Sequence, residues 1–229
     1  MDRRRFAFVA IVSSGLLAMR AVAGAAGLSN ADAALGLKTA LERGVLAAVG
    51  LLGRPDGFLG NPQVRIPLPG FISDTARFLR AMGRGQQLDE LELAMNRAAE
   101  AAVPMAKDLL VNAVKTMTVS DARNILAGGE TSVTAFFAQK TRDPLAARFL
   151  PVVTRATEKV GLAEKYNRVA GKAAGLGLVR QDDANIERYV TRKTLDGLYF
   201  VIGEEEKKIR RDPAGSGSAI LRKVFGALK

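Results

Sequence analysis

The stretch from Asp182 to Arg211 constrains the fold most, because its middle, residues 195–202, is apolar on nearly every side. A helix that is hydrophobic all round is usually buried all round. Charged residues follow, and Asp212-Pro213 should end the element, because the residue before a proline avoids the α conformation. We therefore expect one long helix that begins polar, crosses the core and emerges into water.

A short buried strand is the alternative for part of this stretch. Residues 198–202 lie between two glycines and are rich in side chains that favour strands. A helix is favoured because apolar residues continue at helical spacing on both flanks, at Ile186, Val190 and Ile209.

The charged end of the same stretch supplies acid-first pairs at i,i+4 spacing. Glu204 with Lys208 and Glu206 with Arg210 have the favourable order, and each pair stabilises a helix by about 0.2–0.5 kcal/mol. These pairs predict a solvated end of the helix that is neutralised by its own side chains.

Helical spacing of apolar residues continues through most of the chain. Pro104 should interrupt the helical segment 88–117, since proline removes a backbone hydrogen bond. Thr118 and Asp121 resemble a capping box, and Asp143-Pro144 is expected to open a new helix. We predict an all-α fold: a single-domain helical bundle of about seven or eight helices.

Residues 53–70 break the helical pattern, because this segment contains four prolines and four glycines. Val64, Ile66 and Leu68 alternate within it, which predicts an extended strap whose apolar side chains fill a groove between helices. A loop of this length is otherwise often functional.

The N-terminus resembles an export signal, residues 1–23. Arg3–Arg5 precede an apolar run, residues 6–19, and Ala21-Val22-Ala23 offers a cleavage site. We expect a periplasmic or exported domain, residues 24–229, delivered by the Sec route or a twin-arginine route. No membrane span is expected after cleavage; a permanent N-terminal anchor is the alternative.

The composition excludes several kinds of site. The chain has no cysteine and no histidine, which removes disulfides, thiolate metal sites and every Ser-His-Asp arrangement. We expect no cofactor. The formal net charge is +11, and removing the predicted signal leaves +8. This charge favours an anionic envelope surface as partner, with an apolar ligand as a second candidate, although a merely solvated basic surface also accounts for it. Nucleic acid is not expected, since few aromatic residues are interleaved with the basic ones.

Glu92, Asn96 and Glu100 form a polar stripe at i, i+4, i+8. Their oxygen atoms suit a hard cation such as Ca²⁺ or Mg²⁺, and a carboxylate pair can act as acid and base on a glycan bond. The alternative is an ion-pair stripe that meets Arg or Lys from a neighbour, or a solvated face.

Four further residues are candidates for a ligand or partner surface. Tyr189, Lys193 and Asp196 line up on the long helix, where a buried lysine can act as a base. The alternative is an i,i+3 ion pair between Lys193 and Asp196. Phe225 belongs to a predicted amphipathic helix, residues 218–229, that either docks on the core or lies on a membrane.

Four motifs carry a resemblance to a known family: LSNADAALGLKTAL, GRPDGFLGNPQVRIPLP, LAMNRAAEAAVPMAK and DGLYFVIGEEEKKIRRDP. In this order they resemble bacterial exported proteins grouped as domain of unknown function 4197, over residues 28–225. The resemblance implies one mostly helical domain behind a signal sequence, and it implies no activity. Many relatives begin with a lipoprotein cysteine, which this chain lacks.

These observations favour a non-enzymatic envelope protein that binds a partner or serves a structural role. The alternative is a carboxylate-dependent metal-binding protein or enzyme that acts on cell-envelope material. The sequence leaves the oligomeric state, the ligand and the question of catalysis open.

Overall fold

The structure is a computed structural model that describes residues 30–74 and 76–212. In this part of the chain every regular element is helical, and seven α-helices have nine residues or more. These features confirm the all-α, single-domain prediction. The elements are α1 (Asn30–Leu52), α2 (Gly70–Ser73), α3 (Ala76–Ala81), α4 (Gly85–Ala102), η1 (Val103–Ala106), α5 (Lys107–Lys115), α6 (Val119–Ala127), α7 (Ser132–Thr157), α8 (Gly161–Gly175), η2 (Gln181–Asp183) and α9 (Ile186–Arg211).

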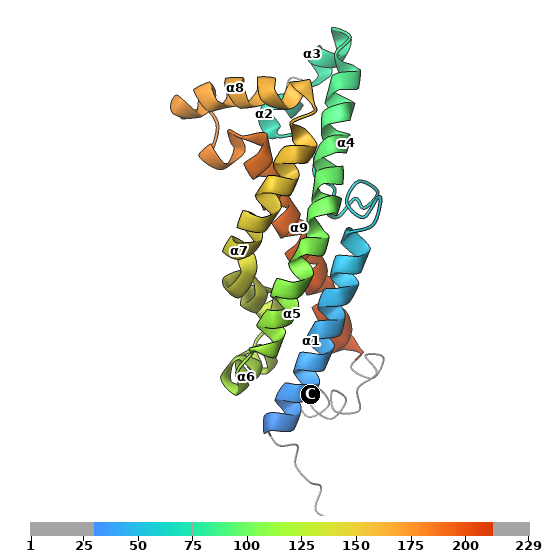
Figure 1. Cartoon of the computed structure of the whole chain (residues 1–229), viewed down its shortest axis with the longest axis vertical. Coiled ribbons are helices and arrows are strands. Elements are labelled where there is room, and N and C mark those ends of the chain that lie inside the picture. Colours follow the sequence, from blue (N-terminus) through green and yellow to red (C-terminus); the bar gives the residue numbers. More distant parts are fainter. Residues whose placement is uncertain (1–29, 75, 213–229) are drawn as a thin grey trace, which may run out of the picture.

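The long helices α1, α4, α7 and α9 run roughly along the long axis of the molecule, whereas α8 lies across its upper end (Figure 1). α9 contacts α7, α1 and α4. Its apolar middle is buried on several sides as a result, and Leu195, Leu198, Tyr199 and Ile202 are all at most 3 % exposed. The long-helix prediction is confirmed, and the strand alternative for residues 198–202 is wrong.

Both ends of α9 are set by local chemistry. The Asn185 side chain accepts a hydrogen bond from the backbone N–H of Arg188 at 2.8 Å, which caps the helix start. The helix ends at Arg211, directly before Asp212-Pro213, as predicted.

The last turns of α9 correct one prediction. The Glu206–Arg210 pair is present at 2.9 Å, but Glu204 pairs with Lys207 and Lys208 with Glu205, each at i,i+3. Glu206 is only 3 % exposed, so this end is not a simple solvated face.

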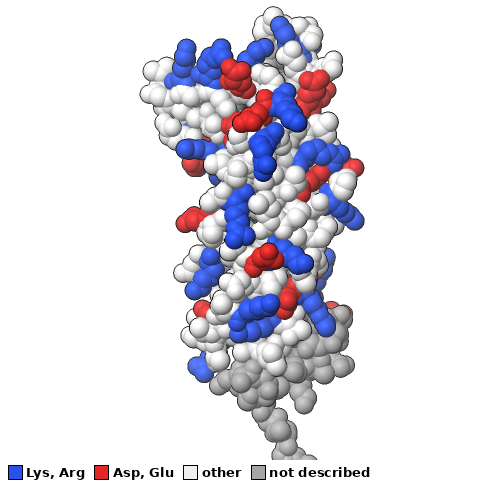
Figure 2. Space-filling model, in the orientation of Figure 1, with Lys and Arg blue, Asp and Glu red and all other residues white. Residues whose placement is uncertain are grey.

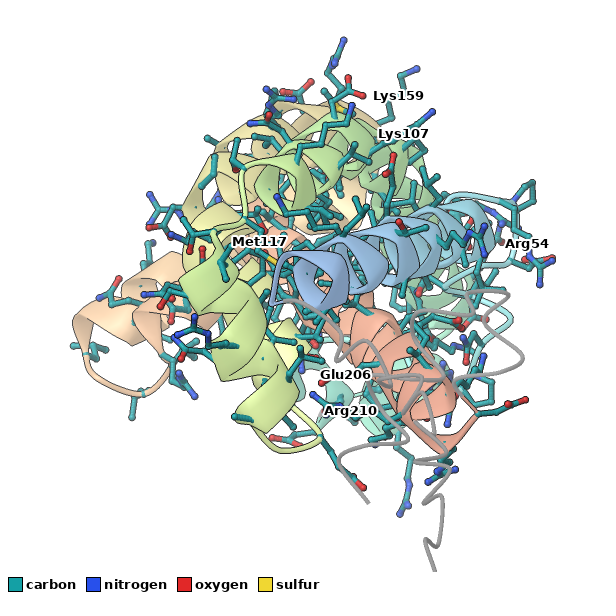
Figure 3. The ribbon with its side chains drawn as sticks, turned by 90° about the horizontal axis from the view of Figure 1, so that it is seen from below. Arg54, Lys107, Met117, Lys159, Glu206 and Arg210 are labelled. Atoms are coloured by element: carbon teal, nitrogen blue, oxygen red, sulfur yellow. The ribbon has the colours of Figure 1, made fainter. Side chains whose placement is uncertain are left out.

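The buried Glu206 carboxylate lies at the start of α7. It accepts hydrogen bonds from the backbone N–H groups of Val133 and Thr134, at 3.3 and 3.4 Å. Arg210 joins the same cluster and donates to the Ile125 carbonyl at 2.9 Å. Figure 3 shows Glu206 and Arg210 together at the lower end of the bundle. A carboxylate at a helix N-terminus satisfies N–H groups that have no partner within the helix.

Proline acts differently at two positions. At Pro104 the helix tightens into the 3₁₀ turn η1 between α4 and α5, as the predicted interruption required. At Pro144 the expected new helix does not begin, because α7 continues from Ser132 to Thr157 with Pro144 and Pro151 inside it. Buried contacts on both sides of Pro144 hold α7 together: Leu145 is fully buried, and the Thr141 hydroxyl bonds to Tyr199 at 2.9 Å.

The segment between α1 and α2 forms the predicted strap, which we define as residues 53–69. It contains turns and then an extended stretch without strand pairing. Val64, Ile66 and Leu68 are 7, 1 and 8 % exposed, which confirms that they fill a groove between helices. Phe58 is fully buried as well. A Cβ on Gly197 of α9 would lie 2.8 Å from the Phe58 ring, so this glycine permits the close approach of the strap.

Charges of both signs are interspersed over the face shown in Figure 2, from α8 at the top to α6 at the bottom. Among the helices of residues 30–74 and 76–212, none is long and apolar enough to span a bilayer. The predicted signal, residues 1–23, and the predicted C-terminal helix with Phe225 lie outside the described residues.

Candidate functional site

The polar stripe on α4 faces the strap. Asn96 is fully buried. Its amide oxygen accepts from the Ile66 N–H at 2.8 Å, and its amide nitrogen donates to the Ile66 carbonyl at 2.9 Å. Asn96 thereby supplies both backbone groups of Ile66 with the partners that a sheet would otherwise provide.

Glu100 also accepts hydrogen bonds from backbone groups of the strap, at its first turn. One carboxylate oxygen accepts from the N–H groups of Phe58 and Leu59, at 3.0 and 3.1 Å. The other accepts from Arg97 at 2.6 Å, and Arg97 also reaches Asp56 at 2.8 Å. Hydrogen bonds to Glu100 and Asp56 raise the pKa of Arg97 above its ordinary value.

Glu92 completes the stripe with an ion pair to Arg65 of the strap at 2.9 Å. The oxygen atoms that would serve as cation ligands thus accept hydrogen bonds from the strap or from arginines. In the described part of the chain, no group of three or more acidic side chains is placed to hold a metal ion. These contacts fit the ion-pair alternative, and the neighbour that supplies Arg65 is the strap.

Tyr189, on α9, also fastens the strap. Its hydroxyl donates to the Pro67 carbonyl at 3.0 Å. Burial is the main reason that the pKa of Tyr189 rises to about 12. The Lys193 ammonium lies 5.9 Å from the centre of the Tyr189 ring, close enough for a cation–π contact. Tyr189 therefore contacts both the strap and Lys193.

Asp196 has different partners from those predicted. It pairs with Arg142 of α7 at 3.1 Å and with Arg192 at 3.7 Å. The expected pair with Lys193 is wrong, because α7 brings Arg142 against α9 while Lys193 lies over the Tyr189 ring. Asp196 directly follows Leu195, which lines a hollow on the described residues.

This hollow is a groove between α7 and α9 that is bounded at one end by η2. Its volume is about 550 Å³, which falls within the range of about 300–1,000 Å³ typical of sites for small molecules. The walls combine apolar and charged side chains: Arg142, Asp143, Ala146, Ala147, Leu150, Asp182, Arg188, Thr191, Arg192 and Leu195. We call this hollow the α7–α9 groove.

Three arginines line the α7–α9 groove, and they differ in their partners. Arg142 pairs with Asp196, and Arg192 pairs with Asp183 and Asp196. Arg188 is exposed, and its guanidinium forms no ion pair within the described residues. One cation of the groove is therefore available to an incoming anion.

Thr191 contributes a second available group. It is 5 % exposed, and its hydroxyl has no hydrogen-bond partner among the described residues. By contrast, Thr194 on the same helix donates to the Val190 carbonyl at 2.7 Å. The Nε–H of Arg192 is also buried without a partner. Leaving such a group unsatisfied costs about 1–3 kcal/mol, so the groove holds unused hydrogen-bond donors beside an apolar wall.

The sequence pattern pointed to Asp196 but not to the groove. The groove residues on α9, Arg188, Thr191, Arg192 and Leu195, share one face at spacings of three and four, which is visible in the sequence. Their partners on α7 are about fifty positions away, and no local signal connects the two sets.

Comparison with known protein families gives a match over residues 27–226 to the model described as "Protein of unknown function (DUF4197)". Neither the curated proteins nor the solved structures gave a match. The match covers all the helices described above and both sides of the α7–α9 groove.

Proposed function

This chain belongs to the DUF4197 family, and we propose that it is a non-enzymatic ligand-binding protein of the bacterial envelope. The ligand site of this proposal is the α7–α9 groove. The ligand is a small amphiphile with one hydrogen-bond-accepting, anionic head and an apolar body.

The single observation that carries the proposal is the buried, unpartnered Thr191 hydroxyl in the groove wall. Arg192 Nε–H and Arg188 add donors near it, and none of these three can be satisfied by an apolar ligand alone. A carboxylate or phosphate is the kind of head group that accepts hydrogen bonds from such donors. Ala146, Ala147, Leu150 and Leu195 provide the apolar surface against which a hydrocarbon body can pack.

Binding is favoured over catalysis by the contacts of the carboxylates. Glu92 and Glu100, which an acid–base or metal mechanism would require, hold the strap. Beside the groove, Asp183 and Asp196 are engaged by arginines.

The envelope location rests on the basic residues and apolar run of residues 1–23. The family match begins at residue 27, which leaves the predicted signal outside the matched region. Sec and twin-arginine export are both compatible with this reasoning.

The test begins with native mass spectrometry of the chain purified without detergent, which should detect a bound anionic amphiphile. Calorimetry then measures the affinity of dodecanoate, below its micelle concentration, for protein freed of ligand. We expect Thr191→Val and Arg188→Gln each to weaken binding about tenfold or more, since a hydrogen bond to a charged group contributes about 1.5–3 kcal/mol.

Matched controls remove the same groups outside the groove. Thr194→Val deletes a hydroxyl that is already bonded within α9, and Arg148→Gln removes an exposed arginine that does not line the groove. Both should bind dodecanoate like the unmodified protein. Dodecanol should bind weakly to all variants. Equal binding by Thr191→Val, Arg188→Gln and the controls would refute the groove as the site.

A further inference from the structure

Helix α8 presents one strongly basic face to solvent. Lys165, Arg168 and Lys172 recur at helical spacing on this face, together with the half-exposed Val169. The opposite face is buried and consists mainly of small residues: Ala163, Tyr166, Ala170, Ala173 and Ala174. α8 is therefore amphipathic, and its outer face is not covered by any described part of the chain.

The loop that follows α8 adds an apolar tip to this face. Leu176 and Leu178 are 77 and 75 % exposed, the two highest values among the large apolar side chains described. They alternate with Gly175 and Gly177, and Gly177 has a positive φ of 74° that turns the chain back towards α9. Exposed apolar side chains that cluster in this way usually mark an interaction surface. We call the α8 face and residues 176–180 the α8 tip.

The charge of the α8 tip has one sign. Between Lys165 and Arg180 the chain has four basic residues and no acidic one. In the sequence, acids flank this range: Glu164 pairs with Arg168 at 2.6 Å, and Asp182 lies 3.9 Å from Arg180. From α4, Glu90 lines a small hollow together with Lys165. Figure 2 shows basic side chains along the upper edge of the lobe that α8 forms.

Hydrogen bonds hold the α8 tip in a fixed position. The Asn167 side chain accepts from the Ile186 N–H at 2.7 Å and donates to Glu187 at 2.9 Å, at the first turn of α9. The Tyr166 hydroxyl donates to the Asp183 carbonyl. The basic face thus lies on a helix that is fastened to the start of α9, and the two leucines follow in the loop directly after this helix.

We propose that the α8 tip docks on an anionic lipid bilayer. In this arrangement Leu176 and Leu178 enter the boundary between headgroups and acyl chains. Lys165, Lys172 and Arg180 lie at the level of the anionic headgroups, where each cation adds to the attraction. The surface is separate from the α7–α9 groove and does not depend on a ligand there.

Two observations favour a bilayer over other occupants. A second copy of the chain would bring two basic faces together, and these would repel each other. Two leucines also offer far less buried surface area than the roughly 1,000 Å² expected of a stable protein interface. The beginning of α1 and the end of α9 lie towards the opposite end of the bundle, so the remaining chain is attached far from the α8 tip (Figure 1).

The electrostatic half of the proposal is tested by flotation with vesicles of phosphatidylglycerol or of phosphatidylcholine. We expect binding only to the anionic vesicles, and binding should fall as salt is added. The triple variant Lys165→Gln, Lys172→Gln, Arg180→Gln should bind about 100-fold more weakly, since each basic residue near the surface contributes about fivefold.

A matched control removes the same charge elsewhere. Arg54, Lys107 and Lys115 are exposed residues on the strap and α5, and Figure 3 shows Arg54 and Lys107 pointing away from the bundle. Their triple glutamine variant should retain most of the binding. If both triple variants lost vesicle binding equally, the proposal would be overturned, because binding would then depend on the net charge of the protein and not on the α8 tip.

Insertion is tested by fluorescence. The chain has no tryptophan, so Leu178→Trp introduces a single reporter at the α8 tip. Its emission should shift to the blue with anionic vesicles, and brominated lipids should quench it. Leu35→Trp, at an exposed position of α1, should show neither effect. An unchanged Leu178→Trp spectrum with anionic vesicles would overturn the proposal.

Light scattering on the same proteins tests whether the α8 tip instead mediates self-association. The proposal expects the Leu176→Gln, Leu178→Gln variant to bind anionic vesicles at least about tenfold more weakly with an unchanged molar mass. If these substitutions instead convert a dimer into a monomer, the α8 tip is a protein interface and the bilayer proposal is wrong.

Discussion

Replacing Thr191 by valine should stabilise the ligand-free protein. The hydroxyl is buried without a partner, whereas valine has the same shape and no polar group. Threonine and valine have nearly equal helix propensities, so the backbone of α9 contributes little to the difference. The change removes a desolvated group for which folding has supplied no hydrogen bond.

The expected magnitude follows from the cost of an unsatisfied polar group, about 1–3 kcal/mol. We take the lower end, because Thr191 lines an open groove, and expect the free energy of unfolding to rise by about 1 kcal/mol. For a domain of this size, this corresponds to a melting temperature about 2–4 °C higher. Thr194→Val provides the opposite case. This substitution removes the hydrogen bond from the Thr194 hydroxyl to the Val190 carbonyl at 2.7 Å, so the free energy of unfolding should fall by about 0.5–1 kcal/mol.

Urea unfolding of both variants, with ligand removed beforehand, measures the two changes under the same conditions. The two substitutions should change the free energy of unfolding in opposite directions, so the comparison does not depend on the exact magnitudes. If Thr191→Val destabilises the protein as Thr194→Val does, the Thr191 hydroxyl has a hydrogen-bond partner. In that case the groove has no unused hydroxyl at Thr191 for a ligand to bind.

Four further outcomes are expected. N-terminal sequencing of the exported protein should begin near Gly24; an intact Met1 on a cytoplasmic protein would refute the signal. Gly197→Ala should destabilise by about 1–3 kcal/mol by crowding the strap, whereas Gly50→Ala, in open space on α1, should stabilise by about 0.5–1 kcal/mol in urea unfolding. The raised pKa of Tyr189 favours the protonated form in the folded state, so its contribution is complete below pH 10 and should be lost between about pH 10 and 12, as measured by melting temperature against pH. Millimolar Ca²⁺ should leave the melting temperature unchanged, because Glu100 is occupied by the strap and Arg97.

Pattern and spacing predicted those features that depend on neighbours in the chain. The apolar middle of α9, the interruption of the helix at Pro104 and the capping box at Thr118 each follow from a few consecutive residues. The burial of Ile66 followed from alternation within the strap. In each case the physical cause, periodic burial or a missing backbone donor, is local.

Features that depend on distant partners were wrong or were missed. Pro144 has the local signature of a helix start, yet tertiary contacts of Thr141 and Leu145 carry α7 through it. Asp196 was a sound candidate for an ion pair, but its partner Arg142 comes from another helix. The apolar pair of the α8 tip, by contrast, is visible in the sequence as Leu176 and Leu178 on either side of Gly177. Only the exposure of the two side chains required the structure.

The central position of α9 determines when the domain can fold. This helix follows all the other described helices in the sequence, and it packs against α1, whose residues are about 150 positions earlier. Domains generally fold as units, and contacts between distant residues form slowly. A chain still being synthesised therefore has α1, α4 and α7 but not the helix that fills the space between them. Because of this order of the helices along the chain, α1, α4 and α7 can pack around α9 only after residues 186–211 have been made.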